Sequence, residues 1–180
     1  YLRGSLVRPL SADSARRWAV GYEVDVAVPV NYTSPVVVQQ AYVEARWLYG
    51  VLTAGAKEYP MELKNQSLSS GSQCLGINAR PIPQVRLALP EYWTLPFGRG
   101  WLQLKGHLAY GMTTDDGWQH DFTKRQTKYC DHMLYHSKAG FLRIGNENAF
   151  CPLSIEMGLE MVAQFGGNAY HLINGNMVQI

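Results

Sequence analysis

The chain alternates apolar and polar residues with a period of two over several long segments, a pattern that predicts β-strands. The runs cover residues 22–30, 40–47, 101–112 and 153–165. Residues 153–165 are rich in Leu, Met, Ala and Glu, which favour helices. A helix would, however, stack Glu156 and Glu160 as a like-charge pair four residues apart. Thirteen residues of strict alternation outweigh that propensity, so we predict a strand.

These alternating runs are long, at eight to thirteen residues. Strands in globular proteins average about five or six residues, whereas a strand that crosses a bilayer at a tilt needs about 9–11. One face of the runs is nearly free of charge, and the other holds Glu, Asp, Lys, His and Gln. The pattern is typical of an all-β fold, an antiparallel transmembrane β-barrel of outer-membrane type, with apolar side chains toward lipid and polar ones toward the lumen.

The connections between the predicted strands alternate in length. Residues 48–50, 95–100 and 145–152 are predicted as short turns, and residues 59–84 and 113–127 as long polar loops. Outer-membrane barrels keep short turns on one side and long loops on the other. The connection 31–35 is short although it falls on the long-loop side. Aromatic residues at or near strand ends fit either the girdles of a barrel or ordinary strand-end packing: Trp18, Trp47, Trp93, Trp101 and Phe165.

Composition narrows the possible partners. The 180 residues carry 16 basic and 14 acidic side chains, for a net charge of +2. That balance argues against a nucleic-acid partner, which would require a basic surface. No run of about 18 apolar residues is present, so the sequence predicts no transmembrane helix.

Few residues suggest catalysis or metal binding. His132 and His136, beside Asp131, would lie about 13 Å apart on a strand, too far for one ion. We expect them to face the polar side with Lys138. Glu156 and Glu160 are separated too widely for a glycosidase pair. The sequence therefore predicts no enzyme, no metal and no cofactor. Instead, we expect a polar interior formed by Lys105, His107, Glu156 and Glu160, with Arg143 or Lys105 as partners for the two glutamates.

The loop at 113–128 is the strongest candidate for ligand binding. It combines aromatic side chains, which can stack on the C–H face of a sugar, with charged groups that can bind hydroxyls. Asp115-Asp116-Gly117 lacks the remaining ligands of a calcium loop and predicts a turn. A solvated surface loop is the alternative. The candidate sugar-binding residues are Trp118, His120, Phe122, Lys124 and Arg125.

Three cysteines limit the possible disulfides. Cys130 and Cys151 are predicted at opposite ends of a strand of about 14 residues, too far apart to pair. Cys74 and Cys130 fall on the same, long-loop side, where a disulfide is geometrically possible.

Several segments together resemble the Wzi-type capsule-assembly outer-membrane proteins. The similar stretches are spread over roughly residues 20–168, and their order is more specific than any one of them. They are residues 57–65 (KEYPMELKN), 68–71 (LSSG), 78–84 (NARPIPQ), 100–101 (GW), 105–111 (KGHLAYG), 134–138 (LYHSK), 143–145 (RIG) and 152–167 (PLSIEMGLEMVAQFGG).

The resemblance implies a closed barrel of roughly 18 strands in the bacterial outer membrane. It also implies a lectin-like, non-enzymatic role in the surface attachment of capsular polysaccharide, with that polysaccharide and outer-membrane lipid as partners. Residues 1–180 would then be a single partial barrel domain of about eight strands, truncated at both ends. No polysaccharide-contacting residue follows from the similarity. A porin with an open lumen and a soluble all-β carbohydrate-binding domain are the alternatives.

Overall fold

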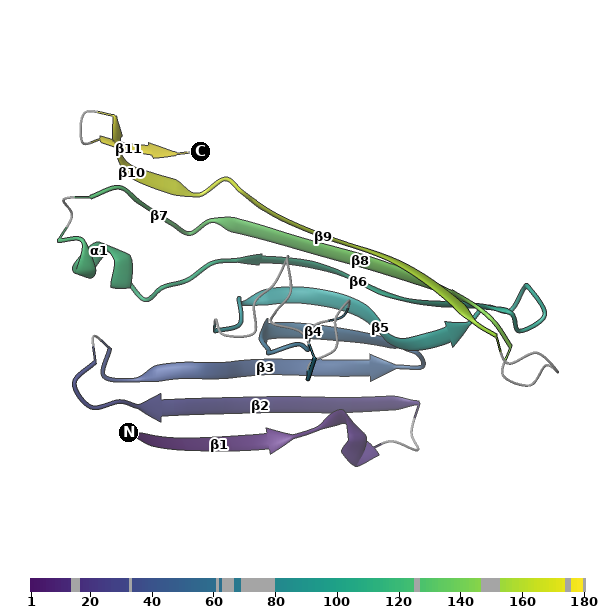
Figure 1. Cartoon of the computed structure of the whole chain (residues 1–180). Helices are drawn as coiled ribbons and strands as arrows, with labels where there is room; N and C mark the ends of the chain where they lie inside the picture. Colours follow the sequence, from purple (N-terminus) through teal and green to yellow (C-terminus); the bar gives the residue numbers. More distant parts are fainter. Residues whose placement is uncertain are drawn as a thin grey trace.

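The chain forms a large antiparallel β-sheet with a smaller sheet at one end (Figure 1). This computed structural model describes residues 1–13, 17–32, 34–60, 62, 67–68, 80–124, 127–146, 153–173 and 176–179. The large sheet has eight strands in the order β1-β2-β3-β4-β5-β6-β8-β9. Their bounds are β1 Leu2–Arg8, β2 Trp18–Val28, β3 Val37–Trp47, β4 Gly50–Ala56, β5 Gln84–Thr94, β6 Leu102–Met112, β8 Leu134–Ile144 and β9 Ile155–Phe165.

The remaining elements are short. A 3₁₀ helix, η1 (Leu10–Asp13), lies between β1 and β2, and one α-helix, α1 (Trp118–Phe122), follows β6. The second sheet has three strands in the order β11 (Asn176–Gln179), β10 (Asn168–Ile173) and β7 (Tyr129–Asp131). No helix in the described part of the chain is both long and apolar enough to cross a membrane.

The all-β, antiparallel prediction is confirmed, and the four alternating runs correspond to β2, β3, β6 and β9. Residues 155–165 form a strand despite their helix-favouring composition, because every one of them pairs with a residue of β8. Six strands of the large sheet have 11 residues each.

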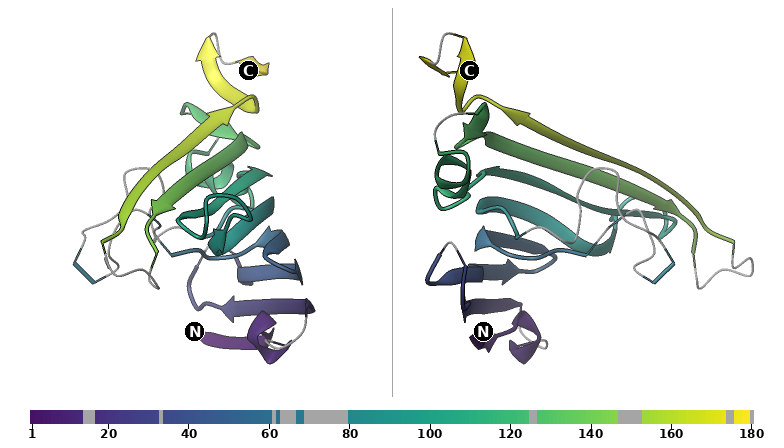
Figure 2. Two further views of the ribbon diagram at one scale, coloured as in Figure 1. Left: turned by 90° about the vertical axis from the view of Figure 1, so that its right-hand side faces the viewer. Right: turned by 60° about the vertical axis from the view of Figure 1, so that its left-hand side comes forward.

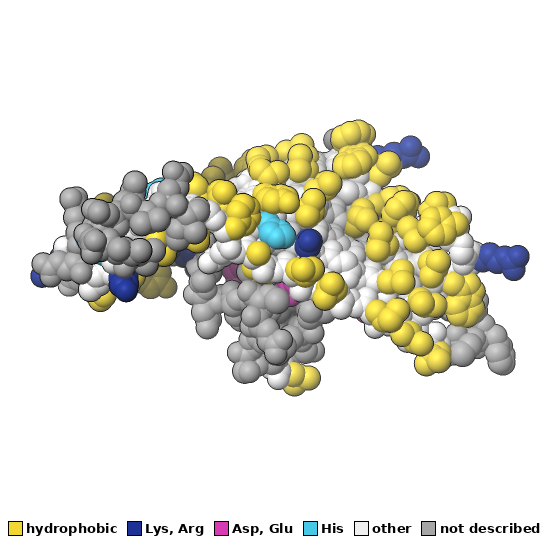
Figure 3. All heavy atoms as spheres, turned by 90° about the horizontal axis from the view of Figure 1, so that it is seen from above, with side chains coloured by type: hydrophobic (Ala, Val, Ile, Leu, Met, Phe, Trp, Pro, Cys, Tyr) yellow, Lys and Arg dark blue, Asp and Glu magenta, His cyan; other side chains and the backbone are white. Residues whose placement is uncertain are grey.

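The register places the apolar sets of neighbouring strands on one side of the sheet, here called the apolar face. Val20 pairs with Ala45, Leu87 with Leu108 and Leu142 with Met157. Large exposed side chains continue this face across the sheet, among them Leu6, Val24, Val43, Leu52, Val85, Leu159 and Met161. Figure 3 shows hydrophobic side chains spread over much of the surface seen from above. The alternation therefore leaves apolar side chains exposed instead of burying them in a core.

The opposite side, here called the polar face, contains the buried charged and polar groups of the sheet. They are Asp25, Glu44, Thr53, Arg86, His107 and Ser137. Arg3 pairs with Asp25 across β1 and β2, and Lys57 pairs with Glu44. The described parts of the connection that follows β4 supply Lys57, Tyr59 and Glu62 to this face. Burial here rests on paired polar groups, which is the condition under which charges are tolerated away from water.

Gly158 is needed for packing on the polar face. It pairs with Phe141, and a Cβ at Gly158 would lie 2.2 Å from the Phe141 ring. The ring therefore lies directly over the glycine backbone, and Lys105 Nζ stands 5.2 Å from the ring centroid. Gly158, a residue that disfavours a helix, has no side chain and so leaves room for the Phe141 ring.

The two ends of the large sheet differ, as the loop lengths predict. The β3–β4 and β5–β6 connections lie at one end, together with η1, the end of β8 and the start of β9 (Figure 1). At the other end, the loop end, lie the β2–β3 connection, α1 and the small sheet. Trp18 pairs with Trp47 at the short-turn end, and Trp101 immediately precedes β6. Phe165 ends β9 at the loop end.

Three details differ from the sequence-based expectations. The predicted 14-residue strand from Cys130 is wrong, because His132, with φ 50°, separates β7 from β8. His136 and Lys138 lie on the apolar face instead of the polar one, since they pair with Tyr110 and Leu108. Alternate residues of a strand share a face, and Leu134, Leu142 and Ile144 alternate with the polar-face residues of β8. His136 and Lys138 fall at the same alternate positions and therefore lie on the apolar face. The strands β10 and β11 were not predicted.

The large sheet is open and strongly twisted (Figure 2). Within the described residues, β1 pairs only with β2, and β9 only with β8. The twist follows from the right-handed twist of individual strands. Both edge strands therefore present unpaired backbone N–H and C=O groups along one side.

Candidate functional site

The candidate polysaccharide-binding residues lie at the loop end, on and around α1. Gly117, with φ 73°, is the N-cap of the helix. Asp115 organises the turn: its Oδ1 accepts a hydrogen bond from Gly117 N at 3.0 Å, and its Oδ2 accepts from Gln119 N and Nε2, both at 3.0 Å. The Asp115-Asp116-Gly117 turn predicted from the sequence is present. Partial burial raises the pKa of Asp115, but the hydrogen bonds from Gln119 and Gly117 outweigh it and leave that pKa below its ordinary value.

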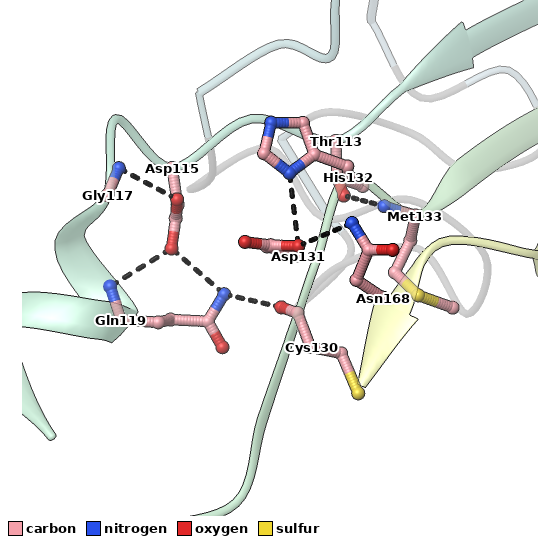
Figure 4. Close-up of polar contacts among 9 residues, drawn as sticks. All are labelled: Thr113, Asp115, Gly117, Gln119, Cys130, Asp131, His132, Met133 and Asn168. Carbon is pink, nitrogen blue, oxygen red and sulfur yellow. Dashed lines mark hydrogen bonds and ion pairs between the residues drawn. The ribbon is translucent and has the colours of Figure 1, made fainter. Parts of the chain in front are cut away.

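Gln119 connects the helix to the small sheet. Its Nε2 donates both to Asp115 and, at 2.9 Å, to the carbonyl oxygen of Cys130 in β7 (Figure 4). Asp131 in β7 accepts a hydrogen bond from Asn168 Nδ2 in β10 at 3.3 Å and lies 3.0 Å from His132 Nδ1. A short helix is marginal by itself. Gln119 therefore ties α1 to β7, and Asn168 ties β10 to β7.

Five aromatic or histidine side chains lie on α1 or on the neighbouring small sheet, and we call them the loop-end aromatic cluster: Trp118, His120, Phe122, Tyr129 and Tyr170. The Trp118 and Phe122 rings stack with centroids 4.9 Å apart, and those of Tyr129 and Tyr170 at 4.6 Å. His120 lies edge-on to Tyr129, with ring centroids 6.4 Å apart. Phe122 is 69% exposed and Trp118 39%, so both rings are accessible to a ligand.

Three of the five residues predicted for this site lie on α1: Trp118, His120 and Phe122. Lys124 lies two residues beyond α1, after the C-cap Thr123. Arg125 lies outside the described residues. Sequence reasoning missed Tyr129 and Tyr170, because only the pairing of β7 with β10 brings them into contact. Cys130 forms no disulfide among the described residues, and its possible partner Cys74 lies outside them, as does Cys151.

Exposed rings beside carboxylates can bind a neutral or charged sugar. Asp121 is exposed next to His120, whose Nδ1 lies 2.8 Å from its carboxylate. Aromatic faces remove apolar C–H surface from water, while carboxylate and imidazole groups exchange hydrogen bonds with hydroxyls. Across the described part of the chain, no group of three or more His, Cys, Asp or Glu side chains is placed to bind a metal ion.

A second concentration of functional groups lies on the polar face, and we call it the Glu62 cluster: Glu62, Arg86, His107, Ser137 and Tyr59. Arg86 Nη2 donates to Glu62 Oε1 at 2.8 Å, and the Arg86 guanidinium lies 3.8 Å from the centroid of the Tyr59 ring. Glu62 Oε2 is 3.5 Å from His107 Nδ1, and His107 Nε2 is 2.8 Å from Ser137 Oγ. Side-chain exposures are 14% for Glu62, 8% for Arg86 and 2% for His107.

The electrostatics of this cluster favour an ionised Glu62. Burial raises the pKa of its carboxyl group, but the contact with His107 and the nearby charge of Arg86 lower it by more, so the net pKa lies below the ordinary value. A buried ion pair is stable only where hydrogen bonds compensate for the lost hydration. Glu62 therefore ties the connection after β4 to the wall formed by β5 and β6.

The order Ser137, His107, Glu62 resembles a nucleophile, a base and an orienting carboxylate. Ser137 is only 2% exposed, however, so its hydroxyl lacks access for a substrate. The 3.5 Å between Glu62 and His107 also exceeds good hydrogen-bond geometry, and Glu62 already binds Arg86. The arrangement is better suited to holding the connection in place than to acyl transfer.

The four residues predicted to line a polar interior all lie on the polar face: Lys105, His107, Glu156 and Glu160. Arg143 Nε donates to Glu156 at 2.7 Å, as predicted, and Tyr92 OH donates to it at 3.0 Å. A cavity of about 350 Å³ remains over this face, lined in part by Glu44, Lys57, Glu62 and Lys105. The polar face is thus partly filled by the chain's own charged side chains.

No protein-family model matches the chain, and neither curated proteins nor solved structures gave a match.

Proposed function

We propose that this chain forms part of the wall of a bacterial outer-membrane β-barrel. The barrel would bind capsular polysaccharide at the cell surface, without catalysis, as the resemblance to Wzi-type proteins implies. The observation that carries the proposal is the two-faced sheet. Eight adjacent strands expose apolar side chains on one face and place paired charges on the other.

Strand length and polarity support a membrane location. Six strands of 11 residues match the roughly 9–11 residues of a tilted membrane strand. An exposed apolar surface spanning a whole sheet far exceeds the few hundred Å² typical of soluble monomers. A soluble sandwich would cover this face with a second sheet. The small sheet, formed by β7, β10 and β11 at the loop end, does not cover the apolar face.

The position of the loop-end aromatic cluster supports the binding role. In outer-membrane barrels the long connections face outward. Trp118 and Phe122 would then be presented to the cell exterior, on a helix held by Asp115 and Gln119. A polymer with repeating sugar units could bind along these rings through many weak contacts.

The porin alternative receives less support from the polar face. Glu62, Arg86 and Tyr59 bring the connection after β4 onto the face that would line the lumen. Conductance in planar bilayers distinguishes the two functions, because an open lumen gives discrete current steps and a filled one does not.

The decisive experiment measures capsule retention in the source organism after deletion of the gene. We expect polysaccharide synthesis to continue while the polymer is shed into the medium. Complementation with Trp118→Ala/Phe122→Ala should fail to restore retention. Complementation with Phe97→Ala, an exposed aromatic at the short-turn end, should restore it. Unchanged retention in the deletion strain would refute the proposed function.

A further inference from the structure

A single lysine interrupts the apolar face. Lys138 lies on this face because it pairs with Leu108 of β6 and with Met161 of β9. Among the described residues, it is the only Lys, Arg, Asp or Glu at a paired position on this face of β2 to β9. Its side chain is exposed, and no carboxylate in the described part of the chain forms an ion pair with it. Lys138 therefore carries an uncompensated positive charge on an otherwise apolar surface.

The place of Lys138 along β8 directs its charge to the loop end. It is the fifth of 11 residues counted from Leu134, where the strand begins at the loop end. At about 3.3 Å per residue its Cα lies about 13 Å along the strand, and a strand tilt of about 40° reduces this to a depth of about 10 Å. A lysine in a membrane extends its ammonium group to the nearer interface. In the proposed barrel, that interface is the one at the loop end.

A row of rings lies between Lys138 and the loop end. The Tyr110 and His136 rings stack with centroids 5.6 Å apart, and the His136 ring lies edge-on to the Phe165 ring at 6.1 Å. The three residues belong to β6, β8 and β9, so the row crosses three adjacent strands (Figure 1). Tyr110 is 56% exposed and Phe165 44%. Exposed aromatic side chains near strand ends are typical of the head-group level of a membrane.

A groove lies next to Lys138 on the side away from the loop end. Gly106 and Gly140 pair with each other, so this point of β6 and β8 has no side chain. The space around the pair measures about 410 Å³. Five of its lining residues are apolar residues of the apolar face, and they are Trp47, Leu87, Leu89, Leu104 and Leu108. Four others have side chains on the polar face, and they are Ala88, Lys105, His107 and Ala139. Because Leu108 also pairs with Lys138, the positive charge stands at the rim of the groove.

We propose that this part of the apolar face binds a phosphorylated, acylated glycolipid. One acyl chain occupies the groove, and a phosphate on the sugar head binds the Lys138 ammonium group. The rings of Tyr110 and Phe165 pack against the C–H surface of the sugar. Three features select this occupant together, because a free polysaccharide lacks the acyl chain and a glycerophospholipid lacks the sugar. The inference rests on the proposed function, in which the loop end meets the outer leaflet of the outer membrane, whose lipid has this chemistry.

The test uses the natural protein purified in maltoside micelles. The probe is diphosphoryl lipid A, and the comparators are its synthetic analogue without phosphates and phosphatidylglycerol. Native mass spectrometry measures the retention of each lipid, and we expect diphosphoryl lipid A to be retained about tenfold more strongly than either comparator. A photoactivatable diazirine near the end of one acyl chain should crosslink to the groove, at Leu87, Leu104 and Leu108.

Variants then separate the phosphate contact from the sugar contact. Lys138→Gln should weaken retention of diphosphoryl lipid A about tenfold and leave retention of the analogue unchanged. Tyr110→Leu should remove the preference for lipid A over phosphatidylglycerol, because it removes an exposed ring of the row. Arg8→Gln is the matched control, since Arg8 pairs with Tyr22 on the apolar face but at the short-turn end of β1. It should change none of these values.

Three results would overturn the inference: equal retention of diphosphoryl lipid A and its analogue by the unaltered protein, unchanged retention of diphosphoryl lipid A in Lys138→Gln, or crosslinks outside the groove. The lipid comparison and the crosslinks need no variant, so misfolding of a variant cannot obscure them. Failure of the polysaccharide role alone would leave these lipid results unchanged. A protein recovered in water without detergent or membrane would instead refute the membrane location on which both proposals rest.

Discussion

Removing the charge of Glu62 should release the connection after β4 from the polar face. In Glu62→Gln the side chain keeps its size but loses its ionic interaction with Arg86 and its contact with His107. Arg86 is only 8% exposed, so its guanidinium would stay largely buried without a counter-charge.

The expected cost follows from this burial. Breaking a buried ion pair by removing one partner destabilises by about 3–5 kcal/mol. Because Glu62 retains 14% exposure and a Gln oxygen can still accept from Arg86, we expect a lower value, about 2–3 kcal/mol. The opening equilibrium of the connection would then rise about 30- to 150-fold.

Hydrogen exchange in detergent measures this opening directly. The amide of Glu58 donates to Gln40 Oε1 at 2.8 Å, so exchange of residues 57–59 reports on docking. The matched control is Glu58→Gln, an exposed carboxylate in the same segment, which should leave exchange unchanged. If Glu62→Gln exchanges no faster than Glu58→Gln, the Glu62 cluster does not hold the connection and our reasoning is wrong.

Further predictions concern pH, the two faces, the aromatic cluster and the open edges. Folding lowers the pKa of Glu62. Docking of the connection after β4 should therefore be fully stable above the ordinary Glu pKa of about 4.3, and should weaken as the pH falls through the lower pKa of the folded protein. Hydrogen exchange of this connection that stays slow through that pH range would contradict the prediction. Leu159→Arg on the apolar face should destabilise the proposed barrel in lipid by up to about 2–4 kcal/mol, whereas Val162→Arg on the polar face should destabilise it less. Urea titration in vesicles measures both free energies of unfolding, and equal losses would show that the faces are misassigned. Phe122→Ala should weaken polysaccharide binding several-fold without changing the unfolding midpoint. A surface-plasmon assay measures the affinity, and thermal melting measures the midpoint. Residues 1–180 alone should aggregate through the free edges of β1 and β9, so a monodisperse sedimentation profile without detergent would refute this expectation.

Much of the large sheet was predictable because alternation is a local property. Most residues of 155–165 favour either the apolar or the polar face according to their own side chain, and this alternation defines a strand and its two faces. Local alternation also placed Glu156 on the same face as its two candidate partners, Arg143 and Lys105, and the pairing of β8 with β9 selects Arg143. It failed for His136 and Lys138, whose side of the sheet is decided by the apolar majority of β8.

The sequence by itself therefore determined the long strands β2, β3, β6 and β9, their two faces and the aromatic composition of the loop that contains α1, because each depends on neighbouring residues. Only the tertiary structure brought Glu62 to Arg86 and His107, Tyr129 to Tyr170, and Ser34 to Asp116. These contacts join residues separated by 24 to 82 positions in the chain. Their formation depends on the register of the strands between them and on the closure of long loops, and a local sequence pattern predicts neither.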